Sequence, residues 1–231
     1  MSLVAQPNVV LLPGLDGTGI LFRPLLAALP ADIQPKVIAY PADQRLSLAE
    51  HANLVACQLP ANIVVVAESF SGLVALDLLS RQAPQIRCVL FVASFAESPN
   101  RLLRLVPLLP WAGSVMRAAP AFALRAFCMG SEATAEQLAL LRESLAAVSP
   151  RVLAHRLGLI GARQIFEEAR FNVPCHYLQA SQDWLVPRTA AGWFQRHFAS
   201  CQVDILDGPH FLLQTRPQLC AEWIGARVRS A

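Results

Sequence analysis

Ser69 stands in a local sequence that could make it a nucleophile. The run Ile63–Ala67 is continuously apolar, as in a buried strand, and an apolar helical pattern follows the serine directly. A serine nucleophile at such a sharp strand-to-helix turn has a strained backbone, and the residues two before and two after it must be small. Ala67 and Ser71 meet this requirement. We therefore predict that Ser69 is a catalytic nucleophile; the alternative is that it only caps the following helix.

A serine hydroxyl needs a base within hydrogen-bond reach, and the base needs a carboxylate that orients it. His210 lies in a turn after the last apolar run, and Asp183 follows the preceding run in an equivalent position. Because the carboxyl ends of parallel strands meet at one edge of a sheet, we expect Ser69, Asp183 and His210 to converge there as nucleophile, acid and base. The remaining histidines fall in helical or strand patterns and are expected to be structural: His51, His155, His176 and His197.

Six short apolar runs could form the sheet that positions these residues. Helical patterns separate most of them, at 22–29, 46–59, 71–80, 188–198 and 218–228. This alternation predicts an α/β fold with a mostly parallel sheet of about six strands and helices on both faces. The expected strands are Asn8–Leu12, Lys36–Tyr40, Ile63–Ala67, Cys88–Ala93, Cys175–Ala180 and Gln202–Leu206.

The alternation breaks between residues 94 and 170, where only helical patterns occur. Thr134 and Gln137 have the spacing of a capping box, ahead of apolar positions that recur as on one face of a helix. The earlier part, 101–124, is apolar and basic, and no acidic residue stands between Glu97 and Glu132. We predict a single domain over residues 1–231, with a helical lid inserted at 94–170.

Composition excludes several other classes of protein. A chain of 231 residues with 55% hydrophobic and 15% charged residues can bury one large core and is not intrinsically disordered. The net charge of +3 is small and scattered, so we expect no nucleic-acid partner. The six cysteines lack C-x-x-C spacing and are expected to be reduced thiols. The apolar run Val9–Leu12 is too short for a signal or membrane helix, which favours a cytoplasmic protein without stable membrane insertion.

Together these motifs resemble the α/β-hydrolase superfamily, and within it a small, carboxylesterase-like serine hydrolase with a helical cap. The resemblance covers essentially the whole chain. The family's G-x-S-x-G has lost both flanking glycines here, and the chain resembles a version shortened at the N-terminus. The four motifs are L-L-P-G-L-D-G-T-G at 11–19, A-E-S-F-S-G at 67–72, D-W-L-V-P at 183–187 and G-P-H at 208–210.

The resemblance implies an oxyanion hole and a reaction. Its two backbone N–H donors correspond to Phe70, which follows the nucleophile, and Leu15, in the loop after the first strand. The implied activity is hydrolysis of aliphatic or acyl carboxylic esters through an acyl-enzyme on Ser69. An acyl thioesterase or an acyltransferase would use the same residues, and a non-catalytic ligand receptor could have the same fold.

Substrate and partners are less constrained by the sequence. Trp111 and Trp184 are candidates for the wall of an apolar substrate pocket, although such residues more often belong to a core. The arginines of the lid could form a solvated face, or could bind an acidic carrier protein or a lipid surface. No cofactor or metal is expected, because the sequence lacks a phosphate-binding glycine loop and metal-ligand spacing.

Overall fold

A computed structural model describes residues 8–109, 111–162, 166 and 170–231. Six parallel strands form one sheet in the order β2-β1-β3-β4-β5-β6, which confirms the predicted fold class. The strands are β1 (Asn8–Leu12), β2 (Lys36–Val37), β3 (Ile63–Glu68), β4 (Ile86–Val92), β5 (Cys175–Ala180) and β6 (Cys201–Leu206).

The second strand is shorter than its apolar run predicts. It was expected to reach Tyr40 but ends at Val37, because the chain then turns toward the loop after β1. The Tyr40 amide donates a hydrogen bond of 2.7 Å to the Gly17 carbonyl instead of continuing the ladder. The difference matters for the site, because this contact holds the loop after β1.

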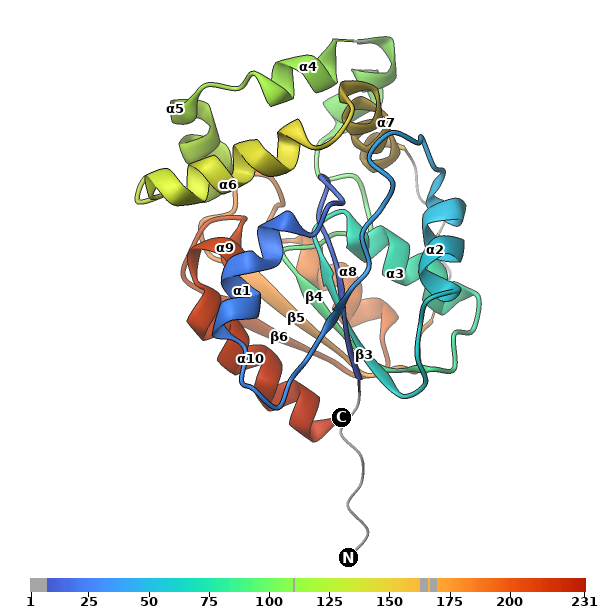
Figure 1. Ribbon diagram of the computed structural model, residues 1–231. Helices are drawn as coiled ribbons and strands as arrows, with labels where there is room; N and C mark the ends of the chain where they lie inside the picture. The colour runs from blue at the N-terminus through green and yellow to red at the C-terminus, as the bar shows by residue number, and fades with distance from the viewer. Residues whose placement is uncertain (1–7, 110, 163–165, 167–169) are drawn as a thin grey trace, which may run out of the picture.

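Helices cover both faces of the sheet, and each face has its own apolar cluster (Figure 1). On one face lie α1 (Arg23–Ala28), which follows the short turn η1 (Ile20–Phe22), and α9 (Leu212–Thr215) and α10 (Pro217–Ser230). On the other lie α2 (Leu48–Ala56), α3 (Ser71–Ser80) and α8 (Ala190–His197). The central strands are buried on both faces, which explains their continuous apolar sequence.

Helical structure fills the space between β4 and β5, as predicted, and we call it the cap. It comprises η2 (Arg101–Leu108), α4 (Ala112–Arg117), α5 (Ala121–Leu124), η3 (Arg125–Met129), α6 (Ala135–Ala146) and α7 (Pro150–Gly161). Figure 1 shows the cap across the end of the sheet where the loops after the strands emerge. The predicted capping box at the start of α6 is present, with both reciprocal bonds between Thr134 and Gln137. The inward residues of α6 form a third apolar cluster.

The cysteines and helices bear on the remaining sequence predictions. All six cysteines are free, as predicted, and Cys57 is exposed whereas three others are buried. Among the described residues, none of the helices combines the length and apolar character needed to cross a bilayer.

Candidate active site

Ser69 lies at the sharp turn between β3 and α3. Its amide donates to the Val92 carbonyl of β4 at 2.9 Å, so the serine still continues the strand on one side. Its φ of 49° is in the left-handed region, which is the strained geometry expected of a nucleophile at such a turn. The N-cap of α3 is Phe70, without a side-chain cap bond. The alternative that Ser69 merely caps the helix is therefore wrong.

The small residues around the turn make specific contacts. Ser71, where the motif usually has glycine, donates its hydroxyl to the Pro13 carbonyl and so ties the loop after β1 to α3. Ser94 donates to the Ser69 carbonyl at 2.8 Å. A Cβ atom on Gly72 would lie 1.7 Å from the Ser94 Oγ, so this close approach requires glycine.

Asp183, His210 and Ser69 converge, as their positions in the sequence predict. The His210 Nδ1 lies 2.7 Å from the Asp183 Oδ2, and the His210 Nε2 lies 2.9 Å from the Ser69 Oγ. When Nδ1 donates to the carboxylate, Nε2 is left to accept the serine proton. The side chains of Asp183 and His210 are only 4% and 6% exposed, respectively. Burial strengthens both hydrogen bonds, because little water competes for them.

The backbone after Asp183 fixes its carboxylate. The Oδ1 atom accepts the amides of Leu185 and Val186, both at 2.8 Å, which leaves Oδ2 for His210. The backbone of the D-W-L-V-P segment thus turns so that its amides point at the Asp183 carboxylate. As a result, the carboxylate cannot rotate away from the imidazole without losing two further hydrogen bonds.

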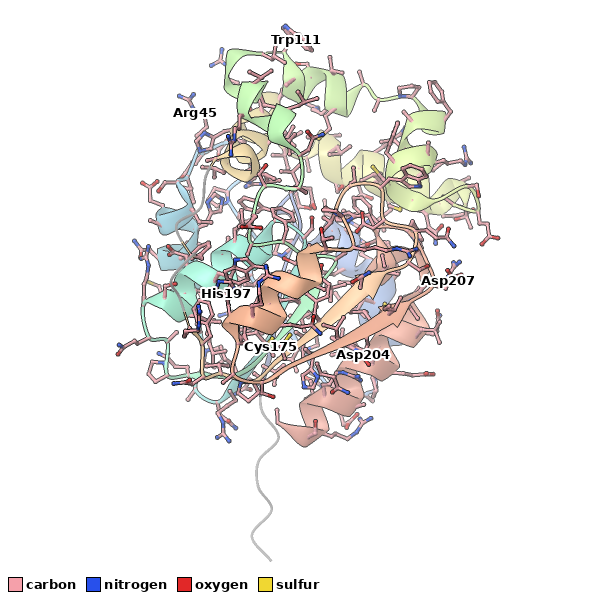
Figure 2. The ribbon with its side chains drawn as sticks, turned by 180° about the vertical axis from the view of Figure 1, so that it is seen from behind. Arg45, Trp111, Cys175, His197, Asp204 and Asp207 are labelled. Carbon is pink, nitrogen blue, oxygen red and sulfur yellow. The ribbon has the colours of Figure 1, made fainter. Side chains whose placement is uncertain are left out.

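Asp207 joins the loop that carries Asp183 to the loop that carries His210. It follows β6, three residues before His210, and its Oδ1 accepts from the Ser181 Oγ at 2.5 Å and the Gln182 Nε2 at 3.0 Å. The Gln182 amide also donates to the Gly208 carbonyl. Figure 2 shows Asp207 at the upper end of the sheet, beneath the cap. These bonds set the separation between Asp183 and His210.

Arg156 of α7 holds the loop after β1 from the cap side. Its side chain is fully buried, and its guanidinium donates to the carbonyls of Leu15 at 3.1 Å, Asp16 at 2.6 Å and Pro41 at 2.8 Å. A Cβ atom on Gly17, whose φ is +71°, would lie 2.4 Å from this guanidinium. Arg156 therefore fixes the backbone of the segment that carries the Leu15 amide.

The amides of Leu15 and Phe70 have no hydrogen-bond partner within the described ranges. Unpaired amides beside a nucleophile are what an oxyanion hole requires, since they must be available to the substrate oxygen. Phe70 itself is fully buried, in edge-to-face contact with Tyr40 and His51, which fixes its backbone at the start of α3.

Glu68, directly before Ser69, is a buried acid. Its Oε1 accepts from the Gln214 Nε2 at 3.0 Å, and its Oε2 has no partner in the described part of the protein. Burial raises the pKa of Glu68 to about 7. Gln214 also accepts, through its backbone carbonyl, from the Gln137 side chain of α6. The cap, α9 and the residue before Ser69 are thus linked.

Comparison with known proteins agrees with this fold. The structure superimposes on an esterase from Exiguobacterium antarcticum with a TM-score of 0.82 at 13% identity, covering 96% of this chain and 92% of that one. The chain has the α/β-hydrolase fold. For the enol-lactonase of Burkholderia xenovorans the TM-score is 0.77 at 16% identity, covering 100% and 94%. For a thioesterase of the prodiginine pathway in Streptomyces coelicolor it is 0.72 at 18%, covering 98% and 90%. No protein-family model matches the sequence, and a search of curated proteins finds no match.

The two tryptophans predicted to contact substrate lie at different places on this α/β-hydrolase fold. Trp184 directly follows Asp183 in the chain, and its side chain is 77% exposed. Trp111 is 55% exposed at the outer end of the cap, pointing away from the sheet (Figure 2). The structure does not bring Trp111 together with Ser69, Asp183 and His210.

Arg156 and Asp207 are the residues that sequence reasoning missed. Arg156 shares one helix face with the buried Val152 and Ile160, four residues before and after it, and an arginine in an apolar stripe is a recognisable signal. Asp207 in the turn after β6 gave no such signal, because its partners are 25 and 26 residues away in the chain. No cluster of three or more potential metal ligands occurs among the described residues.

Proposed function

We propose that this protein is a serine hydrolase that cleaves carboxylic esters of aliphatic or acyl type through an acyl-enzyme on Ser69. The observation that carries the proposal is the continuous pair of hydrogen bonds from Asp183 through His210 to the Ser69 hydroxyl. The solved neighbours named above, an esterase, a lactonase and a thioesterase, support a hydrolase in general terms.

In the proposed reaction, the His210 Nε2 takes the Ser69 proton while the Ser69 Oγ bonds to the ester carbonyl carbon. The amides of Leu15 and Phe70 donate to the oxygen that becomes negative. Collapse of the intermediate releases the alcohol, which leaves with the proton from His210. Water then attacks the acyl-enzyme, with His210 again as the base, and the carboxylic acid is released. Asp183 orients the imidazole and stabilises its charged form throughout.

Turnover of p-nitrophenyl esters of increasing acyl length tests this proposal. We expect activity with an optimum in chain length, and Ser69→Ala or His210→Ala should lower kcat by at least about 10⁴-fold. Ser98→Ala is the matched control, because this half-buried serine bonds, among the described residues, only to the nearby Asn100 carbonyl. Full turnover by Ser69→Ala would refute the assignment.

Two further measurements separate the alternatives that use the same fold. Labelling of Ser69 by a fluorophosphonate probe distinguishes a working triad from a non-catalytic ligand receptor, in which the serine stays unlabelled. Product analysis with acyl thioesters, and with competing alcohols, distinguishes ester hydrolysis from thioesterase and acyltransferase activity. Free acid as the main product from oxygen esters is the expected result.

A further inference from the structure

The outermost part of the cap exposes large apolar side chains. Of the eleven exposed large apolar residues in the described part of the chain, six lie within residues 102–109 and 111–127, which we call the outer cap layer. Figure 1 shows α4 and α5 of this layer on the side of the cap away from the sheet. The six are Leu102, Leu105, Trp111, Val115, Phe122 and Phe127. Such a concentration of exposed apolar side chains in one segment of the cap indicates an interaction surface.

The charges of the outer cap layer are all positive. Arg104, Arg117 and Arg125 lie within it, and the sequence has no acidic residue between Glu97 and Glu132. Neither Arg104 nor Arg125 is bonded to a carboxylate of the described residues, whereas Arg23, on α1, forms an ion pair with Glu143. The layer therefore presents unpaired cations among apolar side chains. Two copies of such a face would repel one another, which argues against a second copy of the chain as its partner.

A cavity of about 500 Å³ lies beside this layer, between η2 and α7. Val106, Leu109 and Leu159 line it, and so do the cationic residues Arg45 and Arg151. Apolar walls with two cations match a molecule that has an anionic head and an aliphatic tail. Figure 2 shows Arg45 toward the same end of the protein as Trp111.

We propose that the outer cap layer docks onto an anionic lipid surface. Aromatic and aliphatic side chains enter the boundary between head groups and acyl chains, while the arginines bind the lipid phosphates. The face of an acidic carrier protein would satisfy the cations but would leave most of the apolar side chains without a matching environment. The docking concerns binding and needs no catalysis by Ser69, so it stands or falls separately from the proposed reaction.

Sedimentation with lipid vesicles tests the proposal. The protein should bind vesicles of equal parts phosphatidylcholine and phosphatidylglycerol, and bind pure phosphatidylcholine weakly. The double variant Arg104→Gln/Arg125→Gln should reduce binding roughly thirtyfold, since each basic residue near an anionic surface contributes about 1 kcal/mol. Leu102→Ser/Phe122→Ser should reduce it by about tenfold or more.

Ile205→Ser is the matched control, because Ile205 on β6 is 68% exposed and Leu102 is 69% exposed. It should bind vesicles as the wild type does, and so should Ser69→Ala. Of the four tryptophans, Trp193 is buried and Trp223 is half-buried, so Trp184→Phe leaves Trp111 as the most exposed one. In this variant the fluorescence emission should shift to the blue on the anionic vesicles. Failure to bind anionic vesicles at low salt would overturn the proposal. An equal loss of vesicle binding in Ile205→Ser and in Leu102→Ser/Phe122→Ser would also overturn it. So would binding to a purified acidic acyl carrier protein without binding to vesicles.

Discussion

Large apolar side chains are buried around the sheet but exposed in the outer cap layer. In the sheet, Phe91 on β4 and Phe194 on α8 are fully buried and pack in ring contact. In the outer cap layer, Phe122 and Phe127 are more than half exposed. A layer that leaves aromatic rings in water gains little stability from them, so their presence points to a task outside the monomer. The loops at one end of the sheet carry Ser69, Asp183 and His210, and the cap lies across that end (Figure 1).

The two regions meet through a few directional contacts around the site. Arg156 of α7 binds the loop after β1, and Gln137 of α6 donates to the Gln214 carbonyl of α9. The Ser149 amide at the start of α7 donates to the Ala42 carbonyl after β2. These bonds link α6 and α7, which we call the inner cap, to the loop after β1, to the segment after β2 and to α9. Substitutions in the inner cap should therefore affect the loop after β1, and substitutions in the outer cap layer should not.

Among substitutions outside Ser69, Asp183 and His210, the largest effect is expected from Arg156→Met. The variant removes the three hydrogen bonds to the carbonyls of Leu15, Asp16 and Pro41, and leaves one buried and two partly buried acceptors without this donor. We expect kcat for p-nitrophenyl esters to fall by about 10²-fold with little change in KM, because a displaced oxyanion donor weakens only the transition state. The free energy of unfolding should fall by about 2–5 kcal/mol.

Arg142→Met is the control for that variant, because Arg142 is exposed on α6 and has no described bonding partner. It should leave kcat and stability unchanged. Arg156→Lys should recover part of the rate, because one ammonium group can reach some of the same carbonyls. A rise in KM with kcat preserved would show that Arg156 acts on substrate binding and not on the oxyanion loop.

Much of the fold and of the candidate site could be predicted from the sequence. The remaining features depend on contacts between residues that are distant in the chain. The strands, the turn at Ser69 and the capping box at Thr134 are encoded by local patterns, because periodicity and turn chemistry act over a few residues. The convergence of Asp183 and His210 follows from parallel-strand topology. By contrast, the exposure of Trp111 depends on how α4 sits on α7, and no local pattern distinguishes an aromatic residue facing out from one facing in.

A smaller effect is expected from Glu68→Gln. Glu68 is buried next to Ser69, and burial raises its pKa from an ordinary value of 4.5 to about 7. Between pH 4.5 and pH 7, the folded state therefore keeps a proton that the unfolded chain has lost. Between these values the unfolded state binds fewer protons, so this residue lowers stability as the pH rises. The glutamine can accept the same Gln214 bond without a charge. The variant should gain on the order of 3 kcal/mol above pH 8.

Urea unfolding of both proteins at pH 5 and pH 8 measures this difference. The pH dependence of stability in the wild type would not by itself isolate Glu68, because His51 also contributes. Burial lowers the pKa of His51 to about 4, so this residue raises stability as the pH rises over an overlapping range. The wild type and the variant share His51, so their difference isolates Glu68. A constant difference between pH 5 and pH 8 would contradict the assignment of a buried, protonated acid.

The smallest effect on stability is expected from Phe122→Ser. Phe122 is 74% exposed on α5, so the substitution removes few packing contacts and should change the free energy of unfolding by no more than about 0.5 kcal/mol. Turnover of a short, soluble p-nitrophenyl ester should also be unchanged, because the ring takes no part in holding the loops around Ser69. Thermal unfolding and kcat/KM measure the two quantities. A loss above about 1 kcal/mol would mean that the ring packs within the protein, and would remove the reason for assigning it to an external surface.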